Sequence, residues 1–461
     1  MIKLYNTLSG TEETFKSIKN KTVGLYTCGP TVYDFAHIGN FRTYIFEDIL
    51  RRVLEFDGYK IKHVANITDV DDKTIKRAIN EKTSLKKITN KYAVNFLADL
   101  DKLNIQKAAL YPRATDNIDE MIKLIQKLLD KEIAYLSSDG SIYFSIKKFK
   151  HYGEFAHLDL SGLVQGARVQ SDNYEKEGTG DFVLWKAWQS SDGENYWKPK
   201  FKLKIENYKL EIVELKGRPG WHIECSAMSQ KFLGQPFDIH AGAVDLIFPH
   251  HQNEIAQSEA ANGKKMANYW LHGEHLLVNG RKMAKSLKNY YTLSDIEKKG
   301  FEPLAFRYLC LETHYRSKLN FTWESLKAAQ NSLSHIRQMA YRTSISGAAG
   351  IRVPKQATAY ETKIISAFND DLDAPKALAL LHKANDFGLW QKFDSILGLN
   401  LSADSFQLTA NQQKLIQDRE SARAQKDFVL ADKIRKDIEK EGIIIEDTPS
   451  GTKIIPAIDK S

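Results

Sequence analysis

Thr27-Cys-Gly-Pro-Thr-Val-Tyr-Asp-Phe-Ala-His-Ile-Gly-Asn-Phe-Arg-Thr43 is the stretch that decides the fold. It follows a short apolar run at residues 23–26, which favours a β-strand. It leads into a segment with apolar side chains at helical spacing, namely Phe41, Ile45, Ile49 and Val53. Gly58 stands where such a helix would end. We therefore predict a strand, a tight loop and a helix, which together open a parallel α/β unit.

A second strand is predicted at residues 59–67, and it ends in the polar run Asn66-Ile-Thr-Asp-Val-Asp-Asp-Lys73. Parallel sheets bind their ligands at the carboxyl ends of the strands, so both loops are candidate binding positions. His37 and Asn40 would lie at the N-terminus of the first helix, where free N–H groups and the helix dipole favour a phosphate. Gly39 would let a flat ring approach the backbone.

Length and composition set the broad class of the protein. The 461 residues suggest about three domains, and 42% apolar residues are enough for real cores. A formal net charge of +8 permits an anionic partner without requiring one. Three cysteines are too few for a disulfide framework, so we expect a reducing, cytoplasmic location. We find no apolar run long enough to span a bilayer and no secretion signal at the N-terminus, so we expect no membrane partner.

The pattern changes along the chain. Residues 113–215 combine a helix, at 118–131, with short β-like pieces and a Lys-rich part at 198–216, and we expect an insertion there. The α/β pattern returns at Gly217, with an apolar strand at 232–239, a loop over 238–245, and a helix starting at Pro249. Asn279-Gly280 predicts a hairpin. Helices are expected from about 320 to 397, then one basic helix over 415–441 and a small β-structure.

Four side chains could form a metal site. His250 and Glu254 are four residues apart on a predicted helix and so share one face, and Cys28 and Cys225 would add two thiolates. This set suits zinc. The alternative is a pair of inert, buried cysteines and a surface His–Glu pair. His240 and His251 are further candidates for contact with a nucleotide, or else hydrogen-bonded core histidines.

Several motifs resemble one known family. His37-Ile-Gly-Asn40 resembles the HIGH motif of class I aminoacyl-tRNA synthetases, with Asn in place of the last His. Three longer runs are similar to signatures of the cysteinyl-tRNA synthetase family, and they are the segments 26–33, 217–228 and 248–259. The resemblance covers nearly the whole chain and is weakest in residues 113–215 and 340–415.

The resemblance implies a site that selects cysteine through a metal. Its zinc ligands, one ion per subunit, would be Cys28, Cys225, His250 and Glu254. Its cysteine pocket would include Cys28, Gly29, Thr68 and Trp221. An ordinary pocket separates near-isosteres only about a hundredfold. Zinc prefers a thiolate to a hydroxyl, and this preference could separate cysteine from serine without an editing site.

ATP binding is implied by a second set of residues. Residues 277–286 resemble the KMSKS signature, with Lys282, Lys285 and Ser286 kept and Ala284 at the third position. The resemblance assigns catalysis to His37, Asn40, Lys282 and Lys285, and ATP binding, with Mg²⁺, to His37, Gly39, Asn40, Gly242, Asp245 and Lys285. Lysine ammonium groups would stabilise the charge that develops on the departing pyrophosphate. The family prefers Gly where Ala241 and Ala243 stand, and the two methyl groups would tighten the nucleotide's fit.

The C-terminal segment 423–432 resembles the family's anticodon-reading helix. Arg423, Phe428 and Asp432 match its base-contacting positions, and Phe428 stands where Trp is common. An aromatic face there can still stack on a base.

These features predict a class I cysteine–tRNA ligase with an α/β fold, acting on L-cysteine, ATP and tRNA(Cys) as a monomer. The expected parts are a split Rossmann-type domain (1–112 and 216–275), a connective insertion (113–215), a linking fold with the KMSKS-like loop (276–319), a helical bundle (320–400) and an anticodon-binding α+β domain (408–461). Two rivals remain: a cysteine:amino-sugar ligase of the mycothiol type, which would lack residues 408–461, and a non-catalytic tRNA-binding paralogue, which would lose the zinc set or Lys285.

Overall fold

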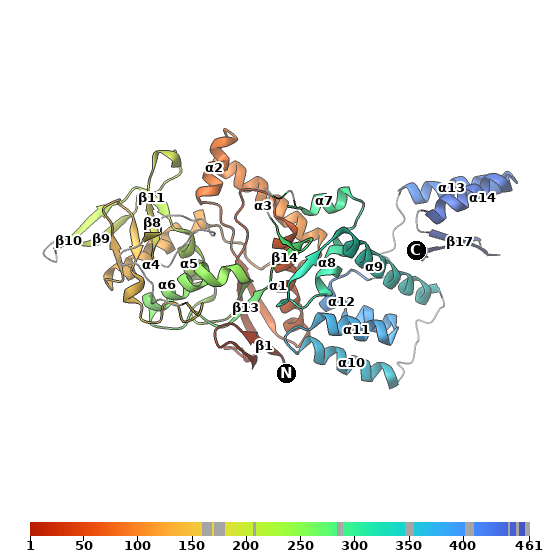
Figure 1. The fold of residues 1–461 in the computed structure, drawn as a ribbon, viewed down its shortest axis with the longest axis horizontal. Helices are drawn as coiled ribbons and strands as arrows, with labels where there is room; N and C mark the ends of the chain where they lie inside the picture. The colour runs from red at the N-terminus through yellow and green to blue at the C-terminus, as the bar shows by residue number, and fades with distance from the viewer. Residues whose placement is uncertain are drawn as a thin grey trace. The chain divides into compact units, whose positions relative to one another are not determined.

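The computed structural model describes residues 1–158, 168–169, 180–205, 209–283, 287, 289–345, 355–401, 410–440, 443–448 and 451–456 (Figure 1). The chain divides into two compact units. The first unit contains residues 1–295 with short returns at 315–320 and 369–372, and the second contains the remaining residues. Among the described helices, none is both long and apolar enough to cross a membrane.

A four-stranded parallel sheet forms the centre of the first unit. Its spatial order is β13 (Ala267–Gly273), β12 (Phe237–Ala243), β3 (Thr22–Thr27) and β4 (Lys60–Ala65). Two strands precede residues 113–215 and two follow them, and β3 pairs with β12 from Leu25–Ile239 to Thr27–Ala241. The carboxyl ends of all four strands therefore meet at one edge.

Helices pack on this sheet through the apolar faces that the sequence predicts. The residues Phe41, Ile45, Ile49 and Val53 on α1 (Ile38–Phe56) are all buried, and Gly58 follows the helix with a φ of 84°. The first unit also contains α2 (Asp72–Asn80), α3 (Leu85–Lys102), α5 (Trp221–Leu233) and α6 (Gln252–Asn262); α5 contacts β3 and β4, α6 packs on α5, and α3 packs on α1. The strand, loop and helix predicted from residues 23–58 are thus confirmed.

Residues between β4 and β12 form a second, mixed sheet. Its path is β11 (Gly217–Pro219), β8 (Asp181–Ala187), β6 (Ile142–Phe144) and β5 (Ala134–Leu136), and β7 (Arg168–Val169) pairs with β8. A separate hairpin consists of β9 (Lys200–Ile205) and β10 (Lys209–Glu214). The predicted helix at 118–131 is α4 (Ile118–Asp130), and it shares one apolar core with α5 and α6.

Shorter elements complete the first unit. They are the hairpin β1 (Lys3–Asn6) and β2 (Thr11–Thr14), the turns η1 (Ala114–Asn117), η2 (Ile146–Lys148), η3 (Ser190–Asp192), η5 (Val244–Leu246) and η6 (Ile247–His251), and the hairpin β14 (Leu276–Val278) and β15 (Arg281–Lys282). Asn279 and Gly280 have φ values of 49° and 72°, as the hairpin dipeptide predicts. The element α7 (Leu293–Lys298) crosses the boundary of the units, and β16 (Leu319–Phe321) pairs with β14.

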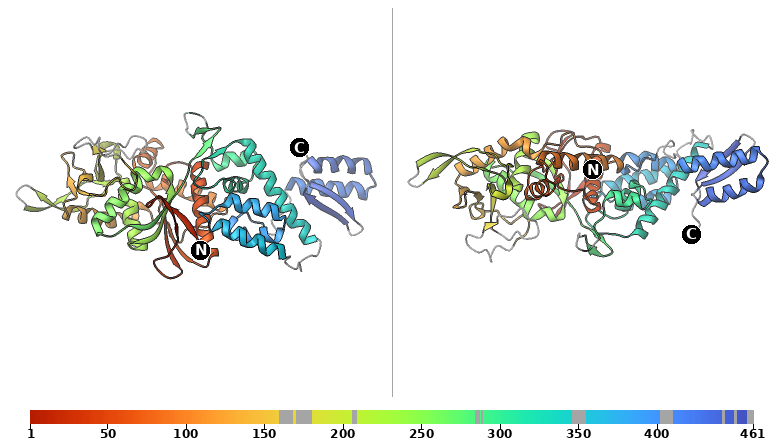
Figure 2. Two further views of the ribbon diagram at one scale, coloured as in Figure 1. Left: turned by 60° about the horizontal axis from the view of Figure 1, so that its bottom comes forward. Right: turned by 90° about the horizontal axis from the view of Figure 1, so that it is seen from above.

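The second unit is mainly helical, as predicted. Its first helices are α8 (Pro303–Leu311), α9 (Trp323–Ile345), α10 (Lys355–Phe368), α11 (Ala374–Ala384) and α12 (Phe387–Leu397). Its C-terminal module has α13 (Ala410–Ala424), α14 (Phe428–Lys440) and the hairpin β17 (Ile443–Thr448) and β18 (Gly451–Pro456). Helices α13 and α14 lie side by side, and α14 packs on β17 around the buried Ile438, Ile443 and Ile445 (Figure 2).

Four predicted boundaries are wrong. The apolar strand expected from residue 232 begins at Phe237, because Phe232 lies in the last turn of α5. Residues 238–243 continue β12 instead of forming a loop, because residues 239–243 pair with β13 and residues 239–241 also pair with β3. The helix expected from Pro249 begins at Gln252, after the π-type turn η6. The single helix expected over 415–441 is broken: Lys426 has a φ of 61°, and the Asp427 carboxylate accepts a 3.0 Å hydrogen bond from the Leu430 N–H and so caps a new helix.

Candidate active site

A pocket of about 840 Å³ lies at the carboxyl edge of the parallel sheet. Each strand contributes the residues that follow it: Cys28 and Gly29 follow β3, Asn66 and Thr68 follow β4, Asp245 follows β12, and Glu274 follows β13. The N-terminus of α1 and the residues at the open end of the β14–β15 hairpin complete the wall; these hairpin residues are Leu276, Lys282 and Met283. This is the position at which parallel α/β sheets bind ligands.

The four predicted metal ligands meet beside this pocket. One ligand atom each from Cys28, Cys225, His250 and Glu254 lies within 4.8 Å of the others. The two sulfur atoms are 4.0 Å apart, and Glu254 Oε1 is 3.9 Å from Cys28 Sγ and 2.8 Å from His250 Nε2. Two thiols, an imidazole and a carboxylate at these separations fit a tetrahedral zinc ion.

Local structure explains why residues so far apart in sequence meet. Cys28 follows the central strand β3, and Cys225 lies in the second turn of α5, which packs beside α6. His250 lies in η6 and Glu254 in the first turn of α6. The Trp221 ring stacks on the His250 ring with 3.7 Å between centroids, which fixes that imidazole from the pocket side.

The protonation of these groups fits a site for a cation. Burial opposes charge on Glu254, but His240 and His250 lower the pKa of its carboxyl to about 2. Burial likewise disfavours a charged His250, but Glu254 and Cys225 raise its pKa to about 10. Burial raises the pKa of Cys28, whereas hydrogen bonds from Cys28 and His250 outweigh burial at Cys225 and lower its pKa to about 6. A divalent cation would replace the imidazole proton as counter-charge, because metal ligands bind deprotonated.

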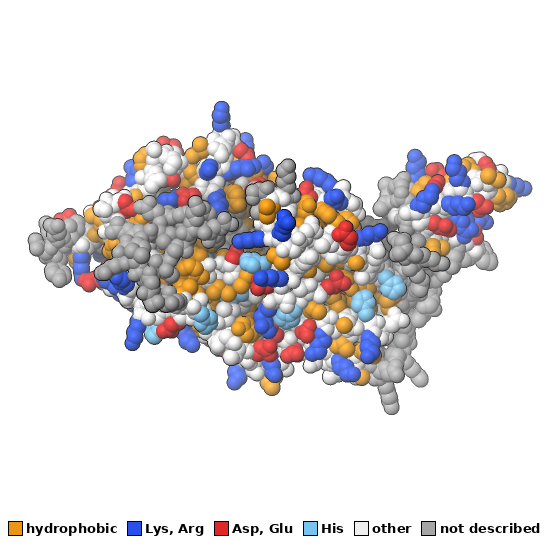
Figure 3. Space-filling model, viewed as in Figure 1, with side chains coloured by type: hydrophobic (Ala, Val, Ile, Leu, Met, Phe, Trp, Pro, Cys, Tyr) orange, Lys and Arg blue, Asp and Glu red, His pale blue; other side chains and the backbone are white. Residues whose placement is uncertain are grey.

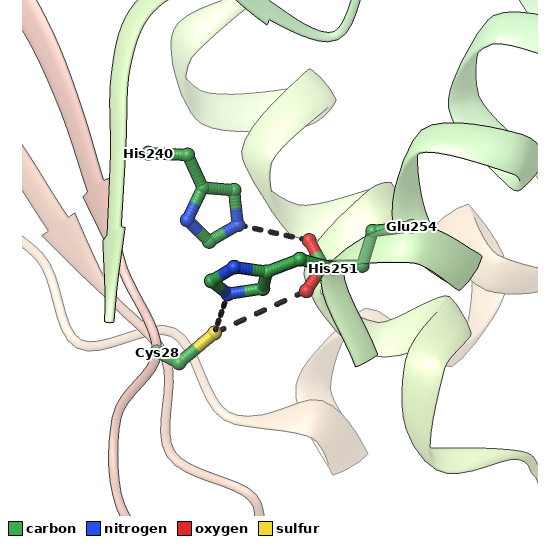
Figure 4. Close-up of side chains that lie close together, drawn as sticks. All are labelled: Cys28, His240, His251 and Glu254. Carbon is green, nitrogen blue, oxygen red and sulfur yellow. Dashed lines mark hydrogen bonds and ion pairs between the residues drawn. The ribbon is translucent and has the colours of Figure 1, made fainter. Parts of the chain in front are cut away.

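A second ligand set shares two of these residues. Cys28, His240, His251 and Glu254 also lie within 4.8 Å of one another (Figure 4). Glu254 Oε2 is 2.9 Å from His240 Nε2, and Cys28 Sγ is 3.4 Å from His251 Nε2. His251 also bonds His272 at 2.8 Å, and burial lowers the pKa of both rings. His240 and His251 are therefore hydrogen-bonded histidines that border the same centre.

The predicted cysteine-binding residues all line the pocket next to this centre. At Gly29 any side chain is excluded, because a Cβ atom would lie 1.6 Å from the Asn66 carbonyl oxygen. The Trp221 indole covers His250, and the Thr68 hydroxyl donates a 2.7 Å hydrogen bond to Glu224 Oε2. Glu224 is a residue that sequence reasoning missed.

The residues expected to bind ATP lie mostly on the opposite wall. His37 caps α1: its Nδ1 accepts from the Asn40 N–H at 3.2 Å, and the Asn40 side chain accepts from the His37 N–H at 3.1 Å. His37, Gly39, Asn40, Asp245 and Lys282 line the pocket. Gly242 is not among the described lining residues; a Cβ there would lie 2.9 Å from Leu246 and 3.1 Å from His251. Lys285, with Ala284 and Ser286, lies outside the described residues.

Sequence reasoning also missed two residues on this wall. Tyr290 packs its ring edge-on against His37, with 4.9 Å between centroids, and Met283 approaches Gly39. Met283 lies within the KMSKS-like segment 277–286, which was the available signal for it, whereas no local pattern marked Tyr290.

The three residues expected to read the anticodon lie in the C-terminal module. Arg423 ends α13 and pairs with Asp447, Phe428 begins α14 with 60% of its surface exposed, and Asp432 is exposed one turn later. Arg423 and Phe428 thus flank the break between the two helices. Figure 3 shows Lys and Arg side chains interspersed with acidic ones over this module.

Comparison with known proteins gives concordant matches. Residues 14–331 match the family model of the class I (C) tRNA synthetase catalytic domain. The chain is 44% identical to the cysteine–tRNA ligases of Protochlamydia amoebophila and Brachyspira hyodysenteriae, over 98% of this chain and 97% and 98% of those proteins. A Mycobacterium tuberculosis methionyl-tRNA synthetase in complex with methionyl-adenylate has a similar fold, with a TM-score of 0.57 and 14% identity over 81% of this chain and 84% of that chain.

Proposed function

This chain belongs to the cysteine–tRNA ligases, within the class I aminoacyl-tRNA synthetases, and from that premise we propose how its residues perform the reaction. The substrates are L-cysteine, ATP and tRNA(Cys). The observation that carries the proposal is the group of two thiols, one imidazole and one carboxylate at the base of the pocket.

Zinc would be held by Cys28, Cys225, His250 and Glu254. When bound there, it would accept the thiolate of cysteine and leave the hydroxyl of serine without a comparable interaction. Trp221 forms one wall of the cysteine pocket. Gly29 lines the pocket beside Cys28 and, lacking a side chain, lets the loop pack against the Asn66 carbonyl, and Thr68 offers a polar contact to the amino acid backbone.

Activation would take place between this centre and the N-terminus of α1. The cysteine carboxylate attacks the α-phosphate of ATP, and the bond to the departing pyrophosphate breaks, giving cysteinyl-adenylate. His37, Gly39 and Asn40 bind the nucleotide near the helix N-terminus, where backbone N–H groups favour phosphate. Gly242 and Asp245 hold the adenosine, while Lys282 and Lys285, with Mg²⁺, stabilise the charge on the pyrophosphate.

Transfer follows when the terminal ribose hydroxyl of tRNA attacks the acyl carbon and AMP leaves. No protein nucleophile is needed, because positioning and charge stabilisation lower the barrier. Residues 408–461 would read the anticodon through Arg423, Phe428 and Asp432. Because the metal site needs ionised thiols at Cys28 and Cys225, we place the protein in a reducing compartment, the cytoplasm.

Two measurements on the purified chain test this proposal. The first is attachment of labelled cysteine to tRNA: we expect ATP-dependent charging of tRNA(Cys). Cysteine-dependent exchange of pyrophosphate into ATP without any charging would favour the amino-sugar ligase, and absence of both would favour the non-catalytic paralogue.

The second measurement is metal analysis. We expect about one zinc ion per chain in the wild type and loss of both zinc and cysteine-dependent exchange in Cys225→Ser. Cys310→Ser is the matched control, because Cys310 is buried in α8, outside both ligand sets. Full zinc content and full exchange in Cys225→Ser would refute the metal assignment.

A further inference from the structure

A chain of hydrogen bonds runs from the substrate pocket to Glu224 on α5. The Gly29 N–H donates to Asn66 Oδ1 at 2.9 Å, Asn66 Nδ2 donates to Thr68 Oγ1 at 3.2 Å, and the Thr68 hydroxyl donates to Glu224 Oε2 at 2.7 Å. Gly29, Asn66 and Thr68 line the pocket, whereas Glu224 is fully buried behind them.

The backbone around Thr68 is also fixed. The Thr68 N–H donates to the Pro30 carbonyl at 3.1 Å, and the Val32 N–H donates to the Thr68 carbonyl at 3.1 Å. The loops that follow β3 and β4 are therefore joined on both sides of Thr68. The hydroxyl has little freedom to turn toward a different partner.

This arrangement decides what Thr68 can offer a ligand. A hydroxyl has one proton and two acceptor positions. The proton is committed to Glu224 and one acceptor position is taken by Asn66, so one acceptor position is left. A substrate group that binds there must donate a hydrogen bond. In a cysteine zwitterion the ammonium is such a donor, and the carboxylate, which only accepts, is not.

The position of Glu224 leaves Thr68 as its link to the pocket. Glu224 is fully buried and its Oε2 accepts the Thr68 proton, whereas Oε1 has no hydrogen-bond partner among the described residues. Glu224 can therefore act on the substrate through the orientation of the Thr68 hydroxyl.

We propose that Glu224 is a positioning residue that holds Thr68 as a hydrogen-bond acceptor for the ammonium group of the amino acid substrate. The proposal rests on the proposed function. It assigns the recognition of the amino group to the chain Asn66–Thr68–Glu224, separately from the recognition of the thiol by Cys28, Cys225, His250 and Glu254.

The test compares cysteine with 3-mercaptopropionic acid, which keeps the thiol and the carboxylate but lacks the ammonium. In pyrophosphate exchange by the zinc-loaded, full-length enzyme, we expect Glu224→Ala to raise the KM for cysteine about tenfold or more. The KM for ATP, the Ki for 3-mercaptopropionic acid and the zinc content should stay within about twofold of wild type. Glu224→Gln, whose side-chain oxygen can accept the same bond, should recover most of the cysteine affinity.

Two further variants separate positioning from simple structural support. Ser229→Ala removes a buried hydroxyl from the same helix. It should leave both KM values, the Ki for 3-mercaptopropionic acid and the zinc content unchanged. Thr68→Val should reproduce the effect of Glu224→Ala, and the double variant should be no worse than either single variant, because both break one chain.

The outcomes distinguish this inference from the proposed function. Absence of cysteine-dependent exchange in the wild type would contradict the proposed function itself. An unchanged KM for cysteine in Glu224→Ala, or a Ki for 3-mercaptopropionic acid that rises in parallel with it, would overturn the inference alone. If 3-mercaptopropionic acid does not inhibit the wild type, the KM values and the double variant decide: additive effects of Thr68→Val and Glu224→Ala would overturn the inference.

Discussion

At the scale of single residues, Glu47 is a carboxyl group that folding removes from water. It lies on α1 with 2% of its surface exposed, and Oε1 has no hydrogen-bond partner among the described residues. Burial raises the pKa of its carboxyl well above the usual value, and a hydrogen bond with Thr27 offsets this only in part. Burial therefore favours the protonated form of Glu47 in the folded protein.

This burial makes stability depend on pH. Because the folded pKa is raised, the unfolded chain loses its proton first as the pH rises, and stability falls above the unfolded pKa of about 4.3. Glu47→Gln cannot ionise at this position. We therefore expect its free energy of unfolding to rise relative to that of the wild type by up to about 1.4 kcal/mol for each pH unit, until the folded pKa of Glu47 is reached. Denaturant unfolding at pH 5 and pH 8 measures the difference.

The exposed Glu324 on α9 supplies the control. Glu324→Gln should change the unfolding midpoint by the same small amount at both pH values. If the stability difference between Glu47→Gln and the wild type is no larger at pH 8 than at pH 5, Glu47 is buried in its charged form.

Some functional residues could be predicted from the sequence, and others could not. Cys28, Cys225, His250 and Glu254 could be named because zinc chemistry limits the residue types and the resemblance supplied the partners. Glu224 could not, because only folding brings α5 against the end of β4, and an acidic residue within a helix looks like a surface residue. Lys285 stays a prediction.

At the scale of secondary structure, the break between α13 and α14 forms the candidate tRNA contact. Phe428 and Val429 begin α14 with 60% and 85% of their surfaces exposed. Arg419, 2% exposed, bonds Asp447 at 2.7 Å and ties α13 to the β17–β18 hairpin. The module therefore presents an exposed aromatic side chain on a supported turn.

Phe428→Ala should separate the two halves of the reaction. Stacking of a base on an aromatic ring contributes about 1–3 kcal/mol, so kcat/KM for tRNA charging should fall about tenfold or more. Cysteine-dependent pyrophosphate exchange should stay at the wild-type rate, because that step does not use tRNA. Val429→Ala is the neighbouring control and should affect neither assay. Charging at the wild-type rate in Phe428→Ala would remove the stacking assignment.

Local patterns predicted most elements because their apolar periodicity matches their burial. These local patterns failed where contacts between distant segments determine where a strand or helix begins and ends. The segment Ala241-Gly-Ala243 of β12 looks like a loop in sequence, but all three residues pair with β13 and Ala241 also pairs with β3. Gln425-Lys-Asp427 contains no Gly or Pro, so the break between α13 and α14 lacked the usual signal.

At the scale of the whole molecule, one chain combines two kinds of recognition. The parallel sheet brings the candidate metal ligands and the residues proposed to bind the amino acid and the nucleotide to one edge. The C-terminal module carries the residues proposed to identify the tRNA. The domain boundaries given above stay predictions, whereas the family match extends over nearly the full length of the chain.

The proposed selection of cysteine over serine rests on the contact between the substrate's sulfur atom and the metal centre. Pyrophosphate exchange by the zinc-loaded protein, measured as kcat/KM with cysteine and with serine, tests it most directly. We predict that cysteine is preferred by far more than the roughly hundredfold that pocket shape alone provides. A preference of a hundredfold or less would contradict selection through the Cys28, Cys225, His250 and Glu254 centre.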